Sequence, residues 1–221
     1  MDASFWHEKW DKNQIAFHQS EAHPMLVGQL GALDLSPGAR VFVPLCGKTL
    51  DIGWLLSQGF RVAGAELSQL AVEQLFDGLG QTPTITETGD LRRYGAEGVD
   101  IFVGDFFALT ADALRPVDAV FDRAALVALP EGMRERYARH LSEVTGAAVQ
   151  LLITFDYDQA EMDGPPFSVP EGEVRRHYEG RFDVSPLVSA PVEGGLKGKC
   201  SAMEEAWLVK AASRQSALRR A

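Results

Sequence analysis

The chain has 221 residues, of which 46% are hydrophobic and 24% are charged, so it is long enough for one α/β domain with a core of ordinary size. Its 31 acidic and 21 basic residues give a formal net charge of −10, which disfavours a nucleic-acid partner because an acidic surface repels phosphate backbones. The two cysteines lack metal-type spacing, and neither a signal peptide nor a membrane-length apolar run is visible. We therefore expect a cytoplasmic monomer that binds no membrane.

Short apolar runs alternate with amphipathic segments, which is typical of a mostly parallel sheet covered by helices on both faces. The predicted strands are Arg40–Pro44, Arg61–Glu66, Asp100–Gly104, Val117–Asp122, Ala148–Thr154, Phe182–Val188 and Ala202–Val209. The predicted helices are Thr49–Ser57, Gln69–Leu79 with Ser68 as its N-cap, Glu131–Leu141 and Pro170–Gly180. The last two strands follow each other without a crossover helix, so they predict an antiparallel C-terminal hairpin. The pattern indicates a seven-stranded, Rossmann-like α/β sheet.

No repeat or flexible linker divides the sequence, so residues 1–221 are predicted to form a single domain. Residues 1–39 form an arm without strands, residues 40–210 carry the sheet and helices, and residues 211–221 form a basic tail. The arm contains Phe5, Trp6, Trp10 and Phe17. We expect these rings to pack at the mouth of the sheet, at the carboxyl ends of its strands, where they would act as a lid.

Two features indicate a nucleoside site at this mouth. The loop Pro44–Lys48 follows the first strand and contains Gly47, which allows a ligand to approach the backbone. Glu66 ends the second strand, and an acid about 20 residues beyond the first turn suits a ribose diol. A helix-capping role for Glu66 is the alternative. The G-x-G-x-x-G pattern of pyrophosphate sites is absent, so the sequence favours S-adenosylmethionine over NAD.

Two further strand ends carry candidate residues. After the third strand, Asp105 could accept a hydrogen bond from an adenine amine or the backbone, and Phe106 could stack on the ring or fill the core. After the fourth strand, Asp122 and Arg123 stand together. Arg123 could act at the site or form a structural ion pair with Asp122, and both interpretations remain open.

Five blocks in the chain carry a specific resemblance. They are W-x-x-x-W (Trp6, Trp10), A-F-H-Q (Ala16–Gln19), V-F-x-P-L-C-G-K (Val41–Lys48), D-R-A-A-L-V-A (Asp122–Ala128) and G-P-P-F-S-V-P (Gly164–Pro170). In this order and spacing the blocks resemble the thiopurine S-methyltransferase family. The resemblance implies a class I methyltransferase fold, which also suits the predicted C-terminal hairpin better than a dehydrogenase sheet does. It further implies that the cofactor is S-adenosyl-L-methionine and the product S-adenosyl-L-homocysteine.

The resemblance also implies roles for individual residues. Arg123 and Phe17 would face the acceptor and take part in catalysis. The positions implied to contact the cofactor are Trp10, Leu45, Glu66 and Arg123, with Trp6, Phe17, Gly47, Asp105 and Phe106 lining the same pocket. Family members methylate aromatic and heterocyclic thiols such as thiopurines, and bacterial members are associated with selenium and tellurium compounds. The short, glycine-rich stretch 189–200 departs from the larger family members, which carry more charged sequence there, close to the acceptor.

Other interpretations stay open at this point. The chain could be a small-molecule methyltransferase with a different acceptor, an NAD-dependent oxidoreductase, or a binding module for S-adenosylmethionine without activity. No metal site is predicted, because the histidines lack ligand spacing. Cys46 is expected to fill its loop rather than act as a nucleophile. The loop around Gly164–Phe167 is either a wall of the acceptor pocket or a rigid turn.

Overall fold

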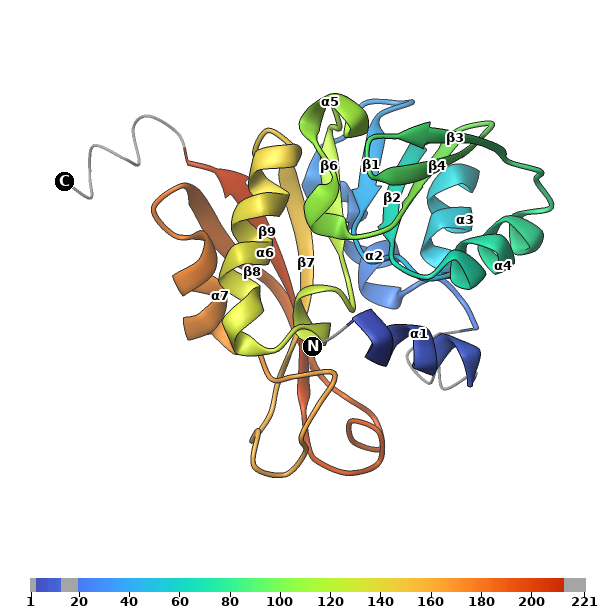
Figure 1. Cartoon of the computed structure of the whole chain (residues 1–221). Coiled ribbons are helices and arrows are strands. Elements are labelled where there is room, and N and C mark those ends of the chain that lie inside the picture. The colour runs from blue at the N-terminus through green and yellow to red at the C-terminus, as the bar shows by residue number, and fades with distance from the viewer. Residues whose placement is uncertain (1–2, 13–19, 213–221) are drawn as a thin grey trace.

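The computed structural model describes residues 3–12 and 20–212, which form one mixed sheet with helices on both faces (Figure 1). Within these residues the sheet has nine strands in the order β3-β4-β5-β2-β1-β6-β7-β9-β8. The strands are β1 (Arg40–Val43), β2 (Arg61–Glu66), β3 (Thr84–Thr88), β4 (Leu91–Ala96), β5 (Val99–Val103), β6 (Ala119–Asp122), β7 (Val149–Asp156), β8 (Phe182–Pro191) and β9 (Met203–Ala211). The helices are α1 (Ala3–Asp11), α2 (Pro24–Gln29), α3 (Leu50–Ser57), α4 (Gln69–Leu79), α5 (Ala111–Leu114), α6 (Glu131–Val144) and α7 (Glu171–Tyr178), and the 3-10 turns are η1 (Leu30–Leu33), η2 (Phe106–Ala108) and η3 (Leu126–Ala128).

The centre of the sheet is parallel, as the alternating pattern predicts. Strand β1 pairs in parallel with β2 on one side and with β6 on the other, and β5 and β7 extend the parallel region outward. The chain runs outward from β1 in both directions, so the strand order reverses between β1 and β6. In an open α/β sheet, this reversal leaves a crevice at the carboxyl ends of the strands. The candidate site is therefore expected at the ends of β1 and β6.

All seven predicted strands are present, but the predicted number of strands is wrong. Two further strands, β3 and β4, extend the sheet at the edge opposite β8 and β9. Strands β3 and β4 form an antiparallel hairpin, and β4 pairs antiparallel with β5. The residues of β3 are almost all exposed. An edge strand with solvent on both faces needs no alternation of apolar and polar residues, which explains why the sequence pattern does not reveal it. The predicted antiparallel hairpin of β8 and β9 is confirmed.

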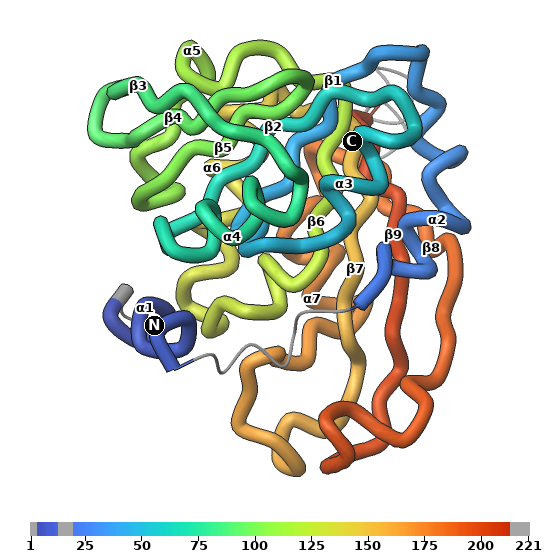
Figure 2. The backbone as a smooth tube through the Cα atoms, turned by 90° about the vertical axis from the view of Figure 1, so that its right-hand side faces the viewer, coloured from blue at the N-terminus to red at the C-terminus, as the bar shows by residue number. Residues whose placement is uncertain are grey.

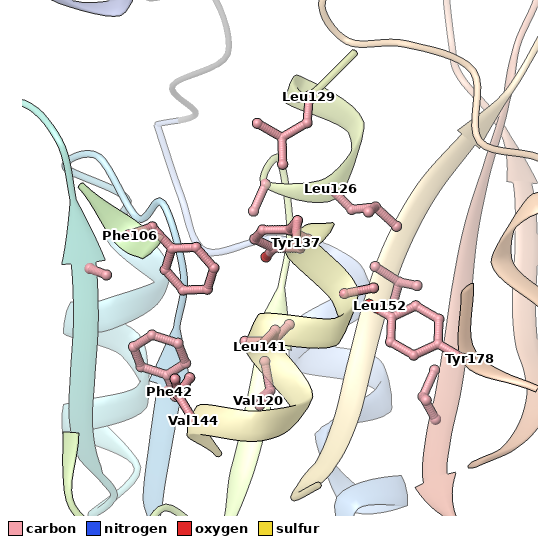
Figure 3. Packing of buried hydrophobic residues seen from close by; sticks show 14 of the residues in the cluster. Phe42, Phe106, Val120, Leu126, Leu129, Tyr137, Leu141, Val144, Leu152 and Tyr178 are labelled. Carbon is pink, nitrogen blue, oxygen red and sulfur yellow. The ribbon is translucent and has the colours of Figure 1, made fainter. Parts of the chain in front are cut away.

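Two apolar layers hold the sheet between its helices. On one face, Phe42, Val120 and Leu152 of the central strands pack against α6 and α7 (Figure 3). On the other face, Val41 and Phe121 belong to the layer that contains the apolar side chains of α3 and α4. Neighbouring residues of one strand thus enter opposite layers, because side chains alternate across a strand. This double burial explains why the central strands are uninterrupted apolar runs in the sequence.

The N-terminal region begins with α1, which contacts α4 and lies beside the carboxyl end of the sheet (Figure 2). Helix α2 follows and packs against β7. The N-cap of α2 is His23, whose side chain accepts a hydrogen bond from the backbone of Met25. Phe17 and the tail beyond residue 212 lie outside the described residues. Within the described part of the chain, no helix is long and apolar enough to span a membrane. The boundaries of the arm and tail stay predictions.

Candidate active site

The loop after β1 turns sharply toward β2. Leu45 and Gly47 both have positive φ angles, of 47° and 53°. The backbone N–H of Cys46 donates to the carbonyl of Ala65 in β2 at 3.0 Å, which keeps the loop close to that strand. Burial, with Glu66 nearby, raises the pKa of the Cys46 thiol, so this side chain stays protonated. The predicted filling role of Cys46 agrees with its burial, and the loop leaves backbone rather than thiol at the site mouth.

Glu66 connects this loop with the loop after β2. One carboxylate oxygen accepts from the N–H of Gly47 at 2.7 Å and the other accepts from the N–H of Ser68 at 2.8 Å. The side chain is 6% exposed, and burial raises its pKa even though these backbone hydrogen bonds lower it. The cap of α4 is Ser68, which accepts from Ala71, as the sequence predicts. Ser68 rather than Glu66 is therefore the N-cap of the helix, and the carboxylate keeps acceptor capacity beyond its backbone bonds.

Trp10 covers the glycine of the same loop. A Cβ atom on Gly47 would lie 3.0 Å from Cζ2 and 3.3 Å from Cη2 of the indole, so the ring rests directly on the backbone there. Trp10 is 5% exposed. Trp6 lies one turn earlier on α1, is half-buried, and packs edge-on against Phe5 with ring centroids 5.2 Å apart. The structure thus brings Trp10, Gly47 and Glu66 together, with Trp6 on the same short helix.

A cavity of about 640 Å³ opens beside this cluster. The ends of β2 and β5 form its floor with Leu67, Ser68, Val103 and Gly104, and His7 and Asp11 reach it from α1. The unpredicted β3–β4 hairpin supplies a wall. The remaining lining residues come from that hairpin (Glu87, Asp90, Arg92) and from α4 (Gln69, Leu70, Glu73). Four carboxylates against one arginine and one histidine make this lining acidic.

The two candidates after β5 have different surroundings. Asp105 accepts a hydrogen bond from the N–H of Phe107 at 3.0 Å and caps η2. Phe106 is 5% exposed, and its ring lies between Phe42 and Tyr137 in the core layer (Figure 3). The Phe106 ring therefore has the core-filling role that the sequence left open. Contact of either residue with an adenine ring stays a prediction.

Asp122 and Arg123 diverge at the end of β6. Asp122 is fully buried and accepts hydrogen bonds from the hydroxyl of Tyr137 at 2.8 Å, the N–H of Leu126 at 3.2 Å and the side chain of Gln150 at 3.4 Å. Burial raises the pKa of Asp122 to about 6. Among the ion pairs of the described residues, Arg123 pairs with Asp51 instead, at 3.9 Å. The sequence allowed a structural ion pair between Asp122 and Arg123, and the described residues do not form it.

Asp51 belongs to a polar cluster that sequence reasoning missed. Its carboxylate accepts from the N–H of His23 and from the hydroxyl of Thr49, each at 2.7 Å. The His23 ring lies 3.0 Å from a carboxylate oxygen of Glu204 on β9. Burial lowers the pKa of the Arg123 guanidinium, and the Asp51 and Glu204 carboxylates oppose this. Asp51 could have been identified from the sequence, because an acid in the first turn of a predicted helix is a recognisable signal. Glu204 could not, because its position in a strand pattern indicates only an exposed charge.

The loop after β7 forms the other side of the mouth. The backbone N–H of Phe167 donates to Val127 in η3 at 2.7 Å, so this loop adjoins the turn that carries Arg123. Lys197 from the β8–β9 connection donates to the carbonyl of Pro165 at 2.6 Å. Figures 1 and 2 both show the loop after β7 beside the β8–β9 connection. The loop thus contacts η3, which follows Arg123 in the chain, and its role as a wall of the acceptor pocket stays a prediction.

Comparison with known proteins identifies the family. The family model described as thiopurine S-methyltransferase matches residues 1–210. The chain is 56% identical over 213 residues to the thiopurine S-methyltransferase of Xanthobacter autotrophicus, covering 96% of this chain and 100% of that protein. It is 50% identical over 207 residues to the thiopurine S-methyltransferase of Teredinibacter turnerae, covering 94% of this chain and 96% of that one.

Solved structures confirm the fold. A SAM-dependent methyltransferase from Anabaena variabilis superposes with a TM-score of 0.64 at 13% identity and 95% coverage of each chain. The 1,6-didemethyltoxoflavin-N1-methyltransferase of Burkholderia thailandensis superposes with a TM-score of 0.62 at 16% identity, over 94% of this chain and 87% of that one. These likenesses confirm the class I methyltransferase fold. The family match decides against an NAD-dependent oxidoreductase. The chain belongs to the thiopurine S-methyltransferase family and is an S-adenosylmethionine-dependent methyltransferase.

Proposed function

We propose that the enzyme transfers the methyl group of S-adenosylmethionine to the sulfur of an aromatic or heterocyclic thiol, with thiopurines as the reference class of acceptor. The observation that supports this most strongly is that Arg123 follows β6 and the Gly47 loop follows β1, two adjacent strands at the point where the strand order reverses. The Gly47 loop in turn contacts Trp10 and Glu66. The similar proteins from Xanthobacter and Teredinibacter carry the name thiopurine S-methyltransferase, which supports the same acceptor class.

The residues at the mouth suit this cofactor. Glu66 is buried, holds its two oxygens in place through backbone hydrogen bonds, and keeps acceptor capacity for ribose hydroxyls. Gly47 lets the Trp10 indole rest on the backbone of this loop, where a side chain would collide with the ring. The acidic lining of the adjacent cavity complements a cofactor with a positive charge. We assign cofactor contacts to Trp10, Leu45, Glu66 and Arg123, with Trp6, Gly47, Asp105 and Phe106 lining the same pocket.

When bound, S-adenosylmethionine supplies an activated methyl group on a positively charged sulfur. The protein therefore needs to orient the acceptor sulfur in line with that methyl group and to exclude water. Aromatic side chains of α1 suit a cationic sulfur, because the face of an aromatic ring attracts positive charge. Phe17, which lies outside the described residues, stays part of the proposed lid. With it we propose Arg123 as the residue that faces the acceptor.

Arg123 suits an acceptor that reacts as an anion. A guanidinium stays protonated at any physiological pH and offers planar N–H donors. Placed near an acceptor sulfur, it favours the thiolate, which is the nucleophilic form. Selenium and tellurium compounds remain further candidate acceptors, because their anions are also soft nucleophiles. A different small-molecule acceptor remains the alternative within the methyltransferases.

Matched acceptor pairs test this proposal. Production of S-adenosylhomocysteine would be measured with thiophenol against phenol, with 6-mercaptopurine against its oxygen analogue, and with selenite and tellurite. The proposal predicts turnover with the sulfur member of each pair and little with the oxygen member. Equal turnover of both members would contradict sulfur specificity. Cofactor binding by calorimetry without turnover of any acceptor would favour a binding module instead.

A further inference from the structure

Arg123 and three side chains near it come from separate parts of the fold. Arg123 follows β6, Asp51 lies in the first turn of α3, His23 caps α2, and Glu204 lies on β9. Asp51 is 2% exposed and lies 3.9 Å from the guanidinium, and it also accepts from the backbone N–H of His23. The His23 ring is 1% exposed and contacts Glu204 at 3.0 Å. The guanidinium is therefore held within a connected polar cluster, which we call the Arg123 cluster.

Two hydrogen bonds join the His23 ring to its surroundings. Its Nδ1 atom accepts from the N–H of Met25 at 3.3 Å. With Nδ1 as the acceptor, Nε2 is the nitrogen that donates to a carboxylate oxygen of Glu204 at 3.0 Å. His23 thereby connects Glu204 to the cap of α2.

The Arg123 cluster thus holds two carboxylates for one guanidinium. Among the described residues, Asp51 and Glu204 are the acids that act on the Arg123 guanidinium. Asp122 neighbours Arg123 in the sequence, but its carboxylate is bound to Tyr137 and Gln150 on the side of α6 and α7. It therefore sits outside the cluster. An acceptor beside Arg123 meets the hydrogen-bond donors of the guanidinium. The two nearby carboxylates, however, reduce the positive electrostatic potential that the guanidinium creates at the acceptor.

We propose that Glu204, held by His23, is a positioning and specificity-determining residue that limits how strongly Arg123 favours an anionic acceptor. This inference rests on the proposed role of Arg123 beside the acceptor. Compensation of the Arg123 charge matters because the same site must also bind a positively charged cofactor. A guanidinium without compensation would favour the thiolate but would repel that cofactor. The carboxylate of Glu204, on the second strand of the C-terminal hairpin, partly offsets the positive charge of Arg123 and so reduces the repulsion of the cofactor.

The strand that carries Glu204 offers a matched control. Glu205 is the next residue on β9, and successive side chains of a strand point to opposite faces of the sheet. Asp156, Glu171 and Ser189 surround Glu205, and none of them belongs to the Arg123 cluster. Glu204→Gln and Glu205→Gln therefore remove the same charge from the same strand on different faces.

The experiment follows the ionisation of a bound acceptor directly. Thiophenol would be bound to the protein loaded with S-adenosylhomocysteine, and the absorbance of its thiolate would be recorded as a function of pH. Loss of one negative charge near the sulfur stabilises the thiolate, so Glu204→Gln is expected to lower the titration midpoint by roughly 0.5 pH unit. Glu205→Gln is expected to leave the midpoint unchanged. Glu204→Met, which is similar in length and uncharged, is expected to repeat the shift if glutamine rearranges.

The outcomes separate this inference from the proposed function. A wild-type protein that binds thiophenol, together with Glu204 variants whose midpoint is unchanged or raised, would overturn the inference alone. An equal shift in Glu205→Gln would also overturn it, because the effect would then reflect net charge rather than position. Failure of the wild-type protein to bind any thiol would overturn the proposed function and this inference with it. Calorimetry with S-adenosylhomocysteine confirms that each variant remains folded and loaded.

Discussion

The indole of Trp10 lies so close to Gly47 that a single added methyl group on the glycine would come within 3.0 Å of the ring. The first helix of the chain is thereby placed on the loop that follows β1. The same glycine donates its backbone N–H to Glu66. Any change at Gly47 therefore disturbs the aromatic cover and the acid of the cofactor site together.

We predict that Gly47→Ala weakens cofactor binding by more than its backbone strain accounts for. Both Gly47 and Gly80 have positive φ angles, of 53° and 65°, but nothing lies within 4 Å of a Cβ on Gly80. Gly80→Ala therefore measures the strain alone, which is expected to cost about 1 kcal/mol of stability. Calorimetry should show a dissociation constant raised tenfold or more in Gly47→Ala only. Similar binding by the two variants would mean that Trp10 does not cover the cofactor.

Glu66→Gln should weaken the binding of S-adenosylmethionine. Loss of a charge-assisted pair of hydrogen bonds costs roughly 1.5–3 kcal/mol, which corresponds to a dissociation constant raised about ten- to a hundredfold. Because the carboxylate also accepts from Gly47 and Ser68, the variant is expected to lose some thermal stability as well. Glu97→Gln is the control, since this exposed carboxylate is not among the residues that line the cavity. Equal affinities of the two variants would remove the ribose assignment of Glu66.

Asp122 should make the protein less stable as pH rises through the weakly acidic range. Its pKa is raised from 3.8 to about 6 by burial, so the native state holds this proton more tightly than the unfolded chain. Its stabilising contribution is present below pH 4 and is lost as pH rises through 6, by on the order of 3 kcal/mol. Asp122→Asn should flatten this part of the curve of unfolding free energy against pH.

The control for Asp122 is Asp163→Asn, which changes an exposed carboxylate in the loop after β7. Chemical denaturation at several pH values between 4 and 7 would give the free energies of unfolding. Parallel curves for wild type and Asp122→Asn would show that the buried carboxylate has an ordinary pKa. The hydrogen bonds from Tyr137 and Leu126 would then compensate fully for its burial.

Replacement of Arg123 should separate structure from reactivity. Arg123→Met removes the ion pair of the buried Asp51, so the protein should lose stability. Adding Asp51→Asn removes the unpaired charge and should recover stability without recovering the rate with thiols. Arg123→Lys should fold and bind the cofactor but react more slowly, because lysine lacks the planar donors.

The pH dependence of turnover distinguishes the roles of Arg123. If the guanidinium favours the thiolate, the rate of Arg123→Met should recover as pH rises and solvent alone ionises the thiol. Its pH–rate midpoint should therefore lie above that of the wild type. Identical midpoints would assign Arg123 a purely structural role. Thermal unfolding of each variant shows whether a low rate reflects an unfolded protein.

The parallel core of this fold can be predicted from sequence because its strands are buried on both faces and read as short apolar runs. Caps such as Ser68 are also visible, since one hydroxyl satisfies a local backbone donor. The β3–β4 hairpin is not visible, because an exposed edge needs no apolar alternation. The predicted strand count was therefore too low, and the wall that this hairpin gives the cavity was missed.

In the candidate site, too, some residues can be predicted from the sequence and others cannot. Glu66 and Gly47 lie within one crossover and meet as their spacing suggests. Arg123 was singled out by its own motif, but its partners Asp51 and Glu204 depend on which strands become neighbours across the sheet. The sequence neighbour Asp122 turned out to face the other layer. Side chains alternate across a strand, so adjacency in sequence is a poor guide to ion pairing at a strand end.

We expect the enzyme to place the methyl group on sulfur. The most direct measurement uses S-adenosylmethionine with a ¹³C-labelled methyl group and 6-mercaptopurine, which offers sulfur and nitrogen nucleophiles in one molecule. The product would be examined by carbon–proton correlation spectroscopy, which distinguishes a methyl group on sulfur from one on nitrogen. We predict a single S-methyl product formed in equal amount with S-adenosylhomocysteine. A methyl group on nitrogen, or cofactor consumption without a methylated acceptor, would contradict methyl transfer to sulfur.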